Sequence, residues 1–167
     1  MRVLAIDPSL RSTGYAVLEE VAKAVKPIEF GEIRNAAKLP VSSCLVAIHD
    51  EIARLIQTYE PECGAIEAVI YVQSFRTAIT LGSARGAAIC AMAARGLPVY
   101  EYAPRRVKQA VVGRGGAVKP QVSFMVRALL GLHENPPSDA ADAIAVGLAH
   151  LQARQAALHG AASLQPL

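Results

Sequence analysis

The chain has little cysteine and no long hydrophobic run. Its three cysteines, Cys44, Cys63 and Cys90, are odd in number and lack the spacing of a zinc motif, so we expect reduced thiols in a cytoplasmic protein. No apolar run approaches the roughly 20 residues of a membrane-spanning helix, and the apolar run before Asp7 is too short for a signal peptide. We therefore expect no membrane partner.

Charged residues are also few. They make up 19% of the 167 residues, whereas hydrophobic residues make up 53%, which indicates a globular chain rather than a disordered one. The length suits a single domain. We expect this domain to span residues 1–154, and we expect residues 155–167, which are rich in Ala and Gln, to form a frayed or disordered tail.

The net charge of +3 is small but unevenly distributed. Between residues 95 and 127 the only acid is Glu101, whereas basic side chains recur throughout. Such a segment is a candidate surface for a polyanion, although a solvated helix surface can have the same composition. The basic residues are Arg95, Arg105, Arg106, Lys108, Arg114, Lys119 and Arg127.

Apolar periodicity predicts that strands come first and that helices and strands then alternate. Residues 2–7, 15–18 and 28–34 are expected to form an antiparallel meander, with residues 20–27 connecting the last two strands. Residues 41–59 carry apolar side chains at three- and four-residue steps, which predicts a helix with one buried stripe. This crossover makes the next strand parallel to the first, so the sequence predicts a mixed α/β sheet.

The second half of the chain is predicted to be mainly helical, with a short strand over residues 99–102. Residues 74–95 form a helix rich in Ala and Gly, which suits close packing either within the chain or across a dimer axis. Pro104 opens a short helix, and residues 118–130 form another. Ser138 is the expected N-cap of a last helix that runs to about Arg154. The inner face of the 118–130 helix is expected to carry Val122, Met125, Val126 and Leu129.

Two of the predicted strands end on an acid. Val3-Leu4-Ala5-Ile6-Asp7 is an apolar run that ends on a carboxylate before Pro8, and Gly64-Ala65-Ile66-Glu67 repeats this ending. Parallel neighbours lie about 4.8 Å apart, so Asp7 and Glu67 are expected at adjacent points. Asp7 before Pro8 is, on its own, also typical of a turn. Two crowded acids repel each other and usually bind a cation.

Asp139 and Asp142 stand three residues apart at the start of the last predicted helix, so their side chains share one face. Acids are common in a first helical turn because of the helix dipole, so neither is informative alone. With Asp7 and Glu67 they form a carboxylate set without His or Cys, which favours Mg²⁺ or Mn²⁺ over structural zinc. Two such ions about 4 Å apart clamp a phosphodiester, and its hydrolysis is the expected reaction.

Several segments together resemble a known family. The chain resembles the RuvC family of bacterial Holliday-junction resolvases over nearly its whole length, to about His150. The matching segments are AIDPSLRSTGYAV (residues 5–17), AIE (65–67), LGSARG (81–86), YEYAP (100–104), VKQ (107–109), VVG (111–113) and SDAADA (138–143).

The resemblance implies an RNase H-like α/β fold, in which helices flank a mixed five-stranded sheet. It implies a homodimer that makes paired, metal-dependent cuts in opposing strands of a four-way DNA junction during recombination and repair. A branch-migration motor complex is a further expected partner. The implied metal-binding catalytic acids are Asp7, Glu67, Asp139 and Asp142, with two Mg²⁺ ions or with Mn²⁺ in their place.

Basic residues near the acids are expected to contact DNA. The resemblance implies this role for Lys108 and Lys119, and Lys119 could also neutralise charge that develops in the transition state. Each is equally an ordinary surface cation when taken alone. We add four further candidate DNA-binding residues: Arg76, Arg105, Arg106 and Arg114.

The loop after Glu67 departs from the family pattern. The family commonly has an aromatic residue where this chain has Ile70; Tyr71 or Phe75 could take its place by stacking on an opened base pair, or both could fill the core. Because the loop from Tyr71 to Arg76 also differs, no cleavage-sequence preference is carried over. Ser9 stands where the family usually has Gly, which narrows the backbone freedom of that turn without removing a ligand.

Three other functions fit parts of the pattern. A branched-DNA nuclease with relaxed specificity is favoured by the altered loop. A junction-binding protein without cleavage is disfavoured by the intact acids. An actin-like nucleotide-binding domain shares a strand that ends in Asp before a Gly-containing hairpin, but it needs a second lobe that this length cannot supply. The Gly-rich segment 113–117 lacks the Gly-Lys-Ser/Thr ending of a P-loop.

Overall fold

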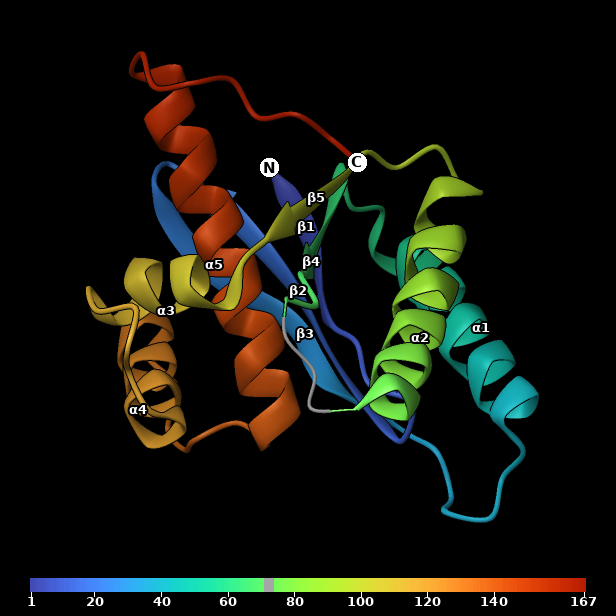
Figure 1. Ribbon diagram of the computed structural model, residues 1–167. Coiled ribbons are helices and arrows are strands. Elements are labelled where there is room, and N and C mark those ends of the chain that lie inside the picture. Colours follow the sequence, from blue (N-terminus) through green and yellow to red (C-terminus); the bar gives the residue numbers. More distant parts are fainter. Residues whose placement is uncertain (71–73) are drawn as a thin grey trace.

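The computed structural model describes residues 1–70 and 74–167 (Figure 1). At its centre is a five-stranded sheet with the order β3-β2-β1-β4-β5. The first three strands form an antiparallel meander, and β4 and β5 continue the sheet parallel to β1, so the predicted mixed sheet is confirmed. The strands are β1 (Arg2–Asp7), β2 (Ser12–Val21), β3 (Ala24–Arg34), β4 (Cys63–Glu67) and β5 (Val99–Tyr102).

Helices cover both faces of the sheet. Two helices, α1 and α2, lie on one face, and α3, α4 and α5 lie on the other (Figure 1). None of the helices within residues 1–70 and 74–167 is long and apolar enough to cross a membrane. The helices are α1 (Val41–Tyr59), α2 (Phe75–Ala93), α3 (Pro104–Val112), α4 (Lys119–Leu130) and α5 (Ser138–Leu158).

Successive residues of β1 face two separate cores. Val3 and Ala5 pack in the core beneath α5, whereas Leu4 and Ile6 pack in the core beneath α1 and α2. All four side chains are fully buried, which makes β1 the central strand that its apolar run predicts. Because side chains alternate along a strand, Asp7 falls on the α5 face.

Two sequence predictions about local structure were wrong. The turn between β2 and β3 contains only Ala22 and Lys23, with φ of 49° and 72°, which are the left-handed values of a tight hairpin turn. The expected connection over residues 20–27 is therefore mostly strand. On α4, Leu129 is 52% exposed and does not share the inner face; Leu130 packs against the core instead.

The last helix also differs from its prediction at both ends. Pro137 rather than Ser138 is the N-cap, and it makes no side-chain capping bond. The helix ends at Leu158, so the predicted boundary after Arg154 falls inside it. Beyond the helix, Leu164 packs against the core, and the Leu167 N–H donates to the carbonyl oxygen of Val99 at 2.8 Å. The chain's end is thus attached to edge strand β5.

The cysteines agree with the prediction of reduced thiols. Cys44 is buried in α1 and Cys63 in β4, whereas Cys90 is exposed on α2, and all three are free.

Candidate metal centre and nucleic-acid interface

The sheet brings Asp7 and Glu67 to the same edge and the same face. Ile6 is paired with Ile66 in the parallel ladder between β1 and β4, so the next residue of each strand is an acid. Cys63 and Ala65 pack in the α5-side core, and alternation therefore places Glu67 on that face with Asp7. Both acids line one pocket of about 440 Å³. The predicted adjacency of these two carboxylates is confirmed.

The start of α5 supplies the other two acids, and a glycine lets it approach the sheet. Asp7 is paired with Gly14 of β2. A Cβ on Gly14 would lie 1.9 Å from the backbone oxygen of Asp139, a distance that no side chain can occupy. Gly14 is therefore required for α5 to begin directly against β2, which places Asp139 and Asp142 over the edge that carries Asp7.

Three of the four predicted acids form a compact group. Asp7, Asp139 and Asp142 each offer a carboxylate oxygen, and these oxygens all lie within 4.8 Å of one another. Glu67 lies outside this group but close enough for its charge to raise the pKa of Asp7. We call these four residues the acidic cluster. Their elements are far apart in sequence, so only the folded sheet and α5 bring them together.

Burial and repulsion between carboxylates favour the protonated forms of Asp7 and Glu67 when no cation is bound. Burial, and then the charges of Glu67 and Asp142, raise the pKa of Asp7 to about 8. Burial and the charge of Asp142 likewise raise the pKa of Glu67 to about 7. Such shifts mark carboxylates whose charge is not compensated by the protein itself.

Two lysines and an arginine border the acidic cluster. Lys119, at the start of α4, donates through Nζ to Oδ2 of Asp142 at 2.7 Å, and this bond raises the pKa of Lys119. The charges of Lys108 and Lys119 both lower the pKa of Glu67, so both lie near it. Arg105 lines the pocket of Asp7 and Glu67. These three predicted DNA-binding residues therefore lie beside the acids.

The donor set of the acidic cluster fits Mg²⁺ or Mn²⁺. It consists of carboxylate oxygens alone, which hard divalent cations prefer. A bound cation would replace the protons that Asp7 and Glu67 otherwise retain, because metal ligands must be deprotonated. The nearest cation among the described residues, Lys119, bonds to only one member of the group and stays mostly exposed.

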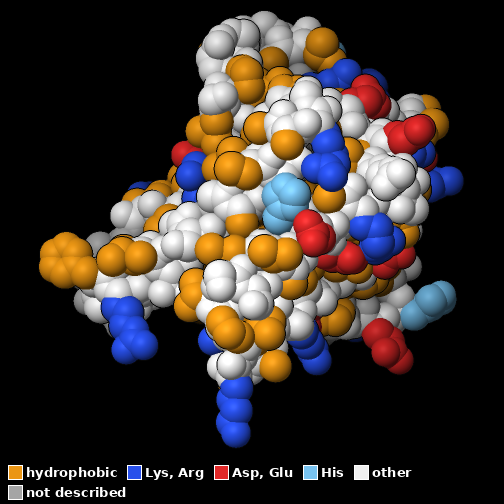
Figure 2. Space-filling view, turned by 90° about the vertical axis from the view of Figure 1, so that its right-hand side faces the viewer, with side chains coloured by type: hydrophobic (Ala, Val, Ile, Leu, Met, Phe, Trp, Pro, Cys, Tyr) orange, Lys and Arg blue, Asp and Glu red, His pale blue; other side chains and the backbone are white. Residues whose placement is uncertain are grey.

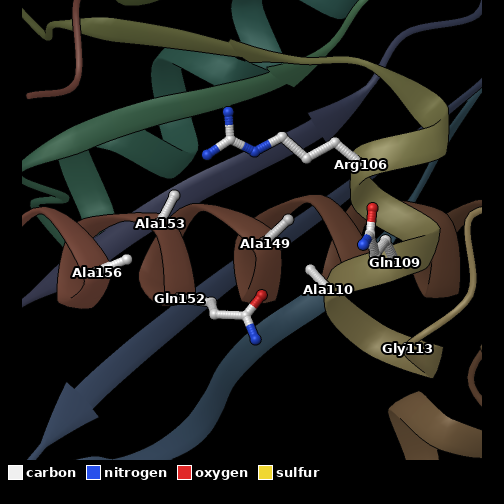
Figure 3. A pocket seen from close by; sticks show the side chains of 8 residues that line it. All are labelled: Arg106, Gln109, Ala110, Gly113, Ala149, Gln152, Ala153 and Ala156. Atoms are coloured by element: carbon white, nitrogen blue, oxygen red, sulfur yellow. The ribbon is translucent and has the colours of Figure 1, made fainter. Parts of the chain in front are cut away.

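Other predicted DNA-binding residues lie away from this pocket. The guanidinium of Arg106 lies over the ring of Tyr102 at 5.7 Å, and Arg106 lines a separate groove of about 520 Å³ between α3 and α5 (Figure 3). Arg114 is exposed in the loop before α4. Arg76 borders a third pocket beside the β1–β2 loop.

The two candidate stacking residues have different outcomes. Phe75, the first residue of α2, is 91% exposed, so the interpretation that it fills the core was wrong. Ile70, at the position of the missing family aromatic, is also exposed. Tyr71 lies outside the described residues. Ser9 does not adopt a positive φ, so its turn does not require a glycine.

Sequence reasoning missed two residues that bind Asp139. Ser12 donates from Oγ to Oδ2 of Asp139, and the Asp139 N–H donates to Oε1 of Glu32 at 3.2 Å. Ser12 is one of two serines in the segment that follows Asp7, and no spacing links it to Asp139. Glu32 is a single acid in a strand and gives no periodic signal. Neither partner could be found without the packing of α5 on β2 and β3.

Known proteins share this sequence and this fold. Residues 3–150 match the family described as crossover junction endodeoxyribonuclease RuvC. The chain is 50% identical over 151 residues to the crossover junction endodeoxyribonuclease RuvC of Akkermansia muciniphila, covering 90% of each chain. It is 44% identical over 152 residues to that of Syntrophomonas wolfei, covering 90% of this chain and 88% of the relative.

A solved structure agrees over the whole chain. It is described as T. thermophilus RuvC in complex with Holliday junction substrate, and it matches with a TM-score of 0.89 and 33% identity over 100% of this chain and 99% of its own. A yeast mitochondrial Holliday junction resolvase, with a TM-score of 0.70 and 11% identity, covers 95% of this chain and 82% of its own and shares the fold. The expected RNase H-like fold is confirmed.

Proposed function

Because the chain belongs to the RuvC family of crossover junction endodeoxyribonucleases, we infer that it resolves Holliday junctions by metal-dependent hydrolysis, with the acidic cluster as its active site. The observation that carries this assignment is the convergence of Asp7, Asp139 and Asp142 within 4.8 Å. A relative with a closely similar structure is described in complex with a Holliday junction substrate. We also propose that the protein acts on recombining DNA in the cytoplasm.

In this proposal Asp7, Glu67, Asp139 and Asp142 hold two Mg²⁺ ions, with Mn²⁺ as an alternative. The ions would supply an activated water and stabilise charge on the leaving oxygen. The protein's own part is positional: β1 and β4 fix two acids on one sheet edge, and α5 brings two more across it. Lys119 stands beside Asp142, where an ammonium can stabilise negative charge at the phosphate under attack.

We propose that the basic residues that border the pocket contact the DNA backbone. Arg105, Lys108 and Lys119 lie beside the acids, so a phosphate that reaches the metal centre would meet all three. Arg76 and Arg114 lie farther out and would contact the arms of the junction, and Arg106 would do so from the groove between α3 and α5. Tyr71 and Phe75 remain the candidates for stacking on an opened base pair.

A homodimer is the proposed assembly. Four-way junctions have two opposing strands to cut, so two active sites related by a two-fold axis match the substrate. The face of α1 and α2 carries many exposed hydrophobic side chains (Figure 2), among them Phe75 and Ile79 at 91% and 70% exposure. Gly82 of α2 faces open space, so a second backbone could approach there closely. A branch-migration motor complex is a further proposed partner.

The decisive experiment compares substrates and metal. Purified protein is incubated with a synthetic four-way junction, a Y-branched duplex and a linear duplex, each with Mg²⁺, with Mn²⁺ or with EDTA. We expect paired nicks in the four-way junction with either metal and none with EDTA. Equal cutting of the Y-branched duplex would favour the relaxed branched-DNA nuclease, and binding without cutting in either metal would contradict the nuclease assignment.

Lys119 can be tested in the same assay. Lys119→Ala should slow junction cleavage, and its effect should depend on salt concentration because phosphate contacts release counterions. The matched control is Lys23→Ala, which removes a lysine from the distant β2–β3 turn. An unchanged rate for Lys119→Ala at every salt concentration would remove Lys119 from the proposed site.

A further inference from the structure

Asp139 is held by side chains from two different strands. Its N–H belongs to the first turn of α5, where N–H groups have no partner within the helix. The N-cap residue, Pro137, provides no side-chain acceptor. Glu32 of β3 takes that place: its Oε1 accepts the Asp139 N–H at 3.2 Å, across 107 residues of sequence. A strand residue therefore caps the helix that carries two of the acids.

Glu32 is itself fixed in place. Its side chain is only 8% exposed, which is unusual for a carboxylate. Its second oxygen, Oε2, accepts a bond of 2.8 Å from Nε of Arg34. With one oxygen bonded to Arg34 and the other to Asp139, the Glu32 carboxylate cannot rotate without losing a partner.

Ser12 fixes the side chain of the same aspartate. Its Oγ donates to Oδ2 of Asp139, across 127 residues of sequence. Ser12 begins β2, two residues before Gly14, which the backbone of Asp139 contacts. The hydroxyl occupies one carboxylate oxygen, so the other, Oδ1, is favoured for a cation.

We propose that Ser12 and Glu32 are positioning residues that hold Asp139 in its metal-binding orientation before the cation arrives. The inference rests on the proposed function, since it requires Asp139 to be a metal ligand. Repulsion from Asp7 and Asp142 would otherwise drive an unrestrained carboxylate outward. A carboxylate that is already oriented loses less conformational freedom on binding, and such supporting hydrogen bonds typically change metal affinity by roughly 10- to 100-fold.

Asp139 and Asp142 are restrained by different physical means. The partner of Asp142 is Lys119, whose side chain is 68% exposed, so that ion pair is weakened by salt. The partners of Asp139 are a neutral hydroxyl and a backbone bond to a nearly buried carboxylate. The effect of losing Ser12 should therefore be nearly independent of salt, in contrast to the effect of losing Lys119.

The test uses two substitutions of equal shape. Ser12→Thr and Ser12→Val are both β-branched and suit a strand, but only threonine keeps the hydroxyl. Binding of Mn²⁺ to the whole protein without DNA is measured by isothermal titration calorimetry, and junction cleavage is measured against Mg²⁺ concentration. We expect Ser12→Val to weaken Mn²⁺ binding roughly tenfold and to raise the Mg²⁺ requirement to the same extent, whereas Ser12→Thr stays near the wild type.

Glu32 is tested by a graded pair. Glu32→Gln keeps an acceptor for the Asp139 N–H and should bind Mn²⁺ more tightly than Glu32→Ala. Ser43→Ala, on the exposed side of α1, is the control for loss of a hydroxyl. Thermal unfolding in EDTA shows whether a variant is merely destabilised. If Ser12→Thr and Ser12→Val melt at the same temperature, a difference in their Mn²⁺ binding does not come from instability.

Asp7→Asn separates the two hypotheses. If Asp7→Asn loses Mn²⁺ binding while Ser12→Val and Ser12→Thr bind it equally, the positioning inference is overturned and the metal centre stands. If Asp7→Asn binds Mn²⁺ like the wild type, the assignment of the acidic cluster fails and the positioning inference fails with it.

Discussion

Two polar clusters lie at different points along the same two elements, β4 and α5. Glu67 ends β4 and Asp139 lies in the first turn of α5, whereas Cys63 begins β4 and His150 lies near the middle of α5. The eleven residues from Asp139 to His150 correspond to roughly 16 Å of helix. The far cluster, which we call the histidine cluster, consists of Cys63, Tyr102 and His150.

The two clusters differ in whether their polar groups have partners within the protein. In the histidine cluster, Nδ1 of His150 lies 2.8 Å from the hydroxyl of Tyr102, and Nε2 lies 3.3 Å from the sulfur of Cys63. Burial lowers the pKa of His150 to about 4 and raises that of Cys63 to about 12, so both stay neutral. Every polar side-chain atom of these three residues therefore has a partner within the cluster, which requires no external ligand.

The acidic cluster is left uncompensated by comparison. Burial and the neighbouring carboxylates raise the pKa of Asp7 and of Glu67, and no described cation bonds to either of them. Burial by itself therefore does not mark a functional site. A buried group whose charged form has no internal partner indicates an external ligand, whereas one with complete hydrogen bonds indicates packing.

The largest expected effect comes from Asp7→Asn. It should abolish junction cleavage, by on the order of 10³-fold or more, because it removes several kcal/mol of metal-based stabilisation. Junction binding should change little, since the basic border is untouched. Cleavage of a labelled four-way junction and a gel-shift assay in Ca²⁺ measure the two quantities, and cleavage near the wild-type rate would contradict the site.

The same variant should be more stable than the wild type without metal. Burial and the neighbouring carboxylates raise the pKa of Asp7 from its usual 3.8 to about 8 in the folded protein. The contribution of the protonated Asp7 carboxyl to the free energy of unfolding is therefore complete below pH 4 and is lost as the pH rises through 8. Asparagine cannot ionise, so in EDTA at pH 9 Asp7→Asn should melt on the order of 5 °C above the wild type, and the difference should disappear near pH 4.

Gly14→Ala should have the next largest effect, because it displaces Asp139 of the acidic cluster. The added Cβ would meet the backbone of Asp139 at 1.9 Å, and backbone cannot move aside as a flexible side chain can. We expect a loss of about 3 kcal/mol in the free energy of unfolding, and a roughly 100-fold loss of cleavage from the displaced Asp139. Urea unfolding and the junction assay measure these.

The control for Gly14→Ala is Gly116→Ala. A Cβ at Gly116 meets nothing within 4 Å, so this change should leave the unfolding free energy within about 0.5 kcal/mol of the wild type. Equal stability of the two alanine variants would mean that α5 does not require its close approach to β2.

The sequence was sufficient to predict which acids the fold brings together in the acidic cluster. The repeated Ala-Ile-acid ending placed Asp7 beside Glu67 because parallel neighbours keep their register, and Ile6 does pair with Ile66. The three-residue spacing of Asp139 and Asp142 put both on one helix face. The bounds of α1 and β5 also agree with the predicted residues 41–59 and 99–102, since their patterns are regular and their ends carry Pro or Gly.

What the sequence could not reveal depends on packing between distant elements. Ser12 and Glu32 reach Asp139 across more than 100 residues, with no spacing that would link them. Arg106 looked equivalent to Arg105 in a basic run, but adjacent helix residues face different directions, and Arg106 lies in the groove between α3 and α5. His150 gave no signal either, because its partners lie on two different strands.

A change in the histidine cluster should affect stability alone. His150→Leu leaves Tyr102 and Cys63 without their buried partner, so we expect a loss of about 2 kcal/mol in the free energy of unfolding at pH 7. The cleavage rate at 25 °C in saturating Mg²⁺ should stay within twofold of the wild type. A large loss of cleavage in a folded variant would show that the two clusters are coupled.

The pH dependence of this loss has the opposite sign to that of Asp7. Burial lowers the pKa of His150 from its usual 6.5 to about 4 in the folded protein. The contribution of the neutral His150 imidazole to the free energy of unfolding is therefore complete above pH 6.5 and is lost as the pH falls through 4. The stability gap between the wild type and His150→Leu should narrow between pH 7 and pH 4.5, as thermal melts at both values can determine.

Tyr102→Phe should have the smallest effect. It keeps the ring, which is 2% exposed, and removes only the hydroxyl that pairs with Nδ1 of His150, so the expected loss is about 1 kcal/mol by urea unfolding at pH 7. In a His150→Leu background that hydroxyl already lacks its partner, and the same substitution should then cost nothing or stabilise the fold. If Tyr102→Phe costs the same in both backgrounds, the hydroxyl is satisfied by something other than His150, and the histidine cluster is no longer the self-contained counterpart of the acidic one.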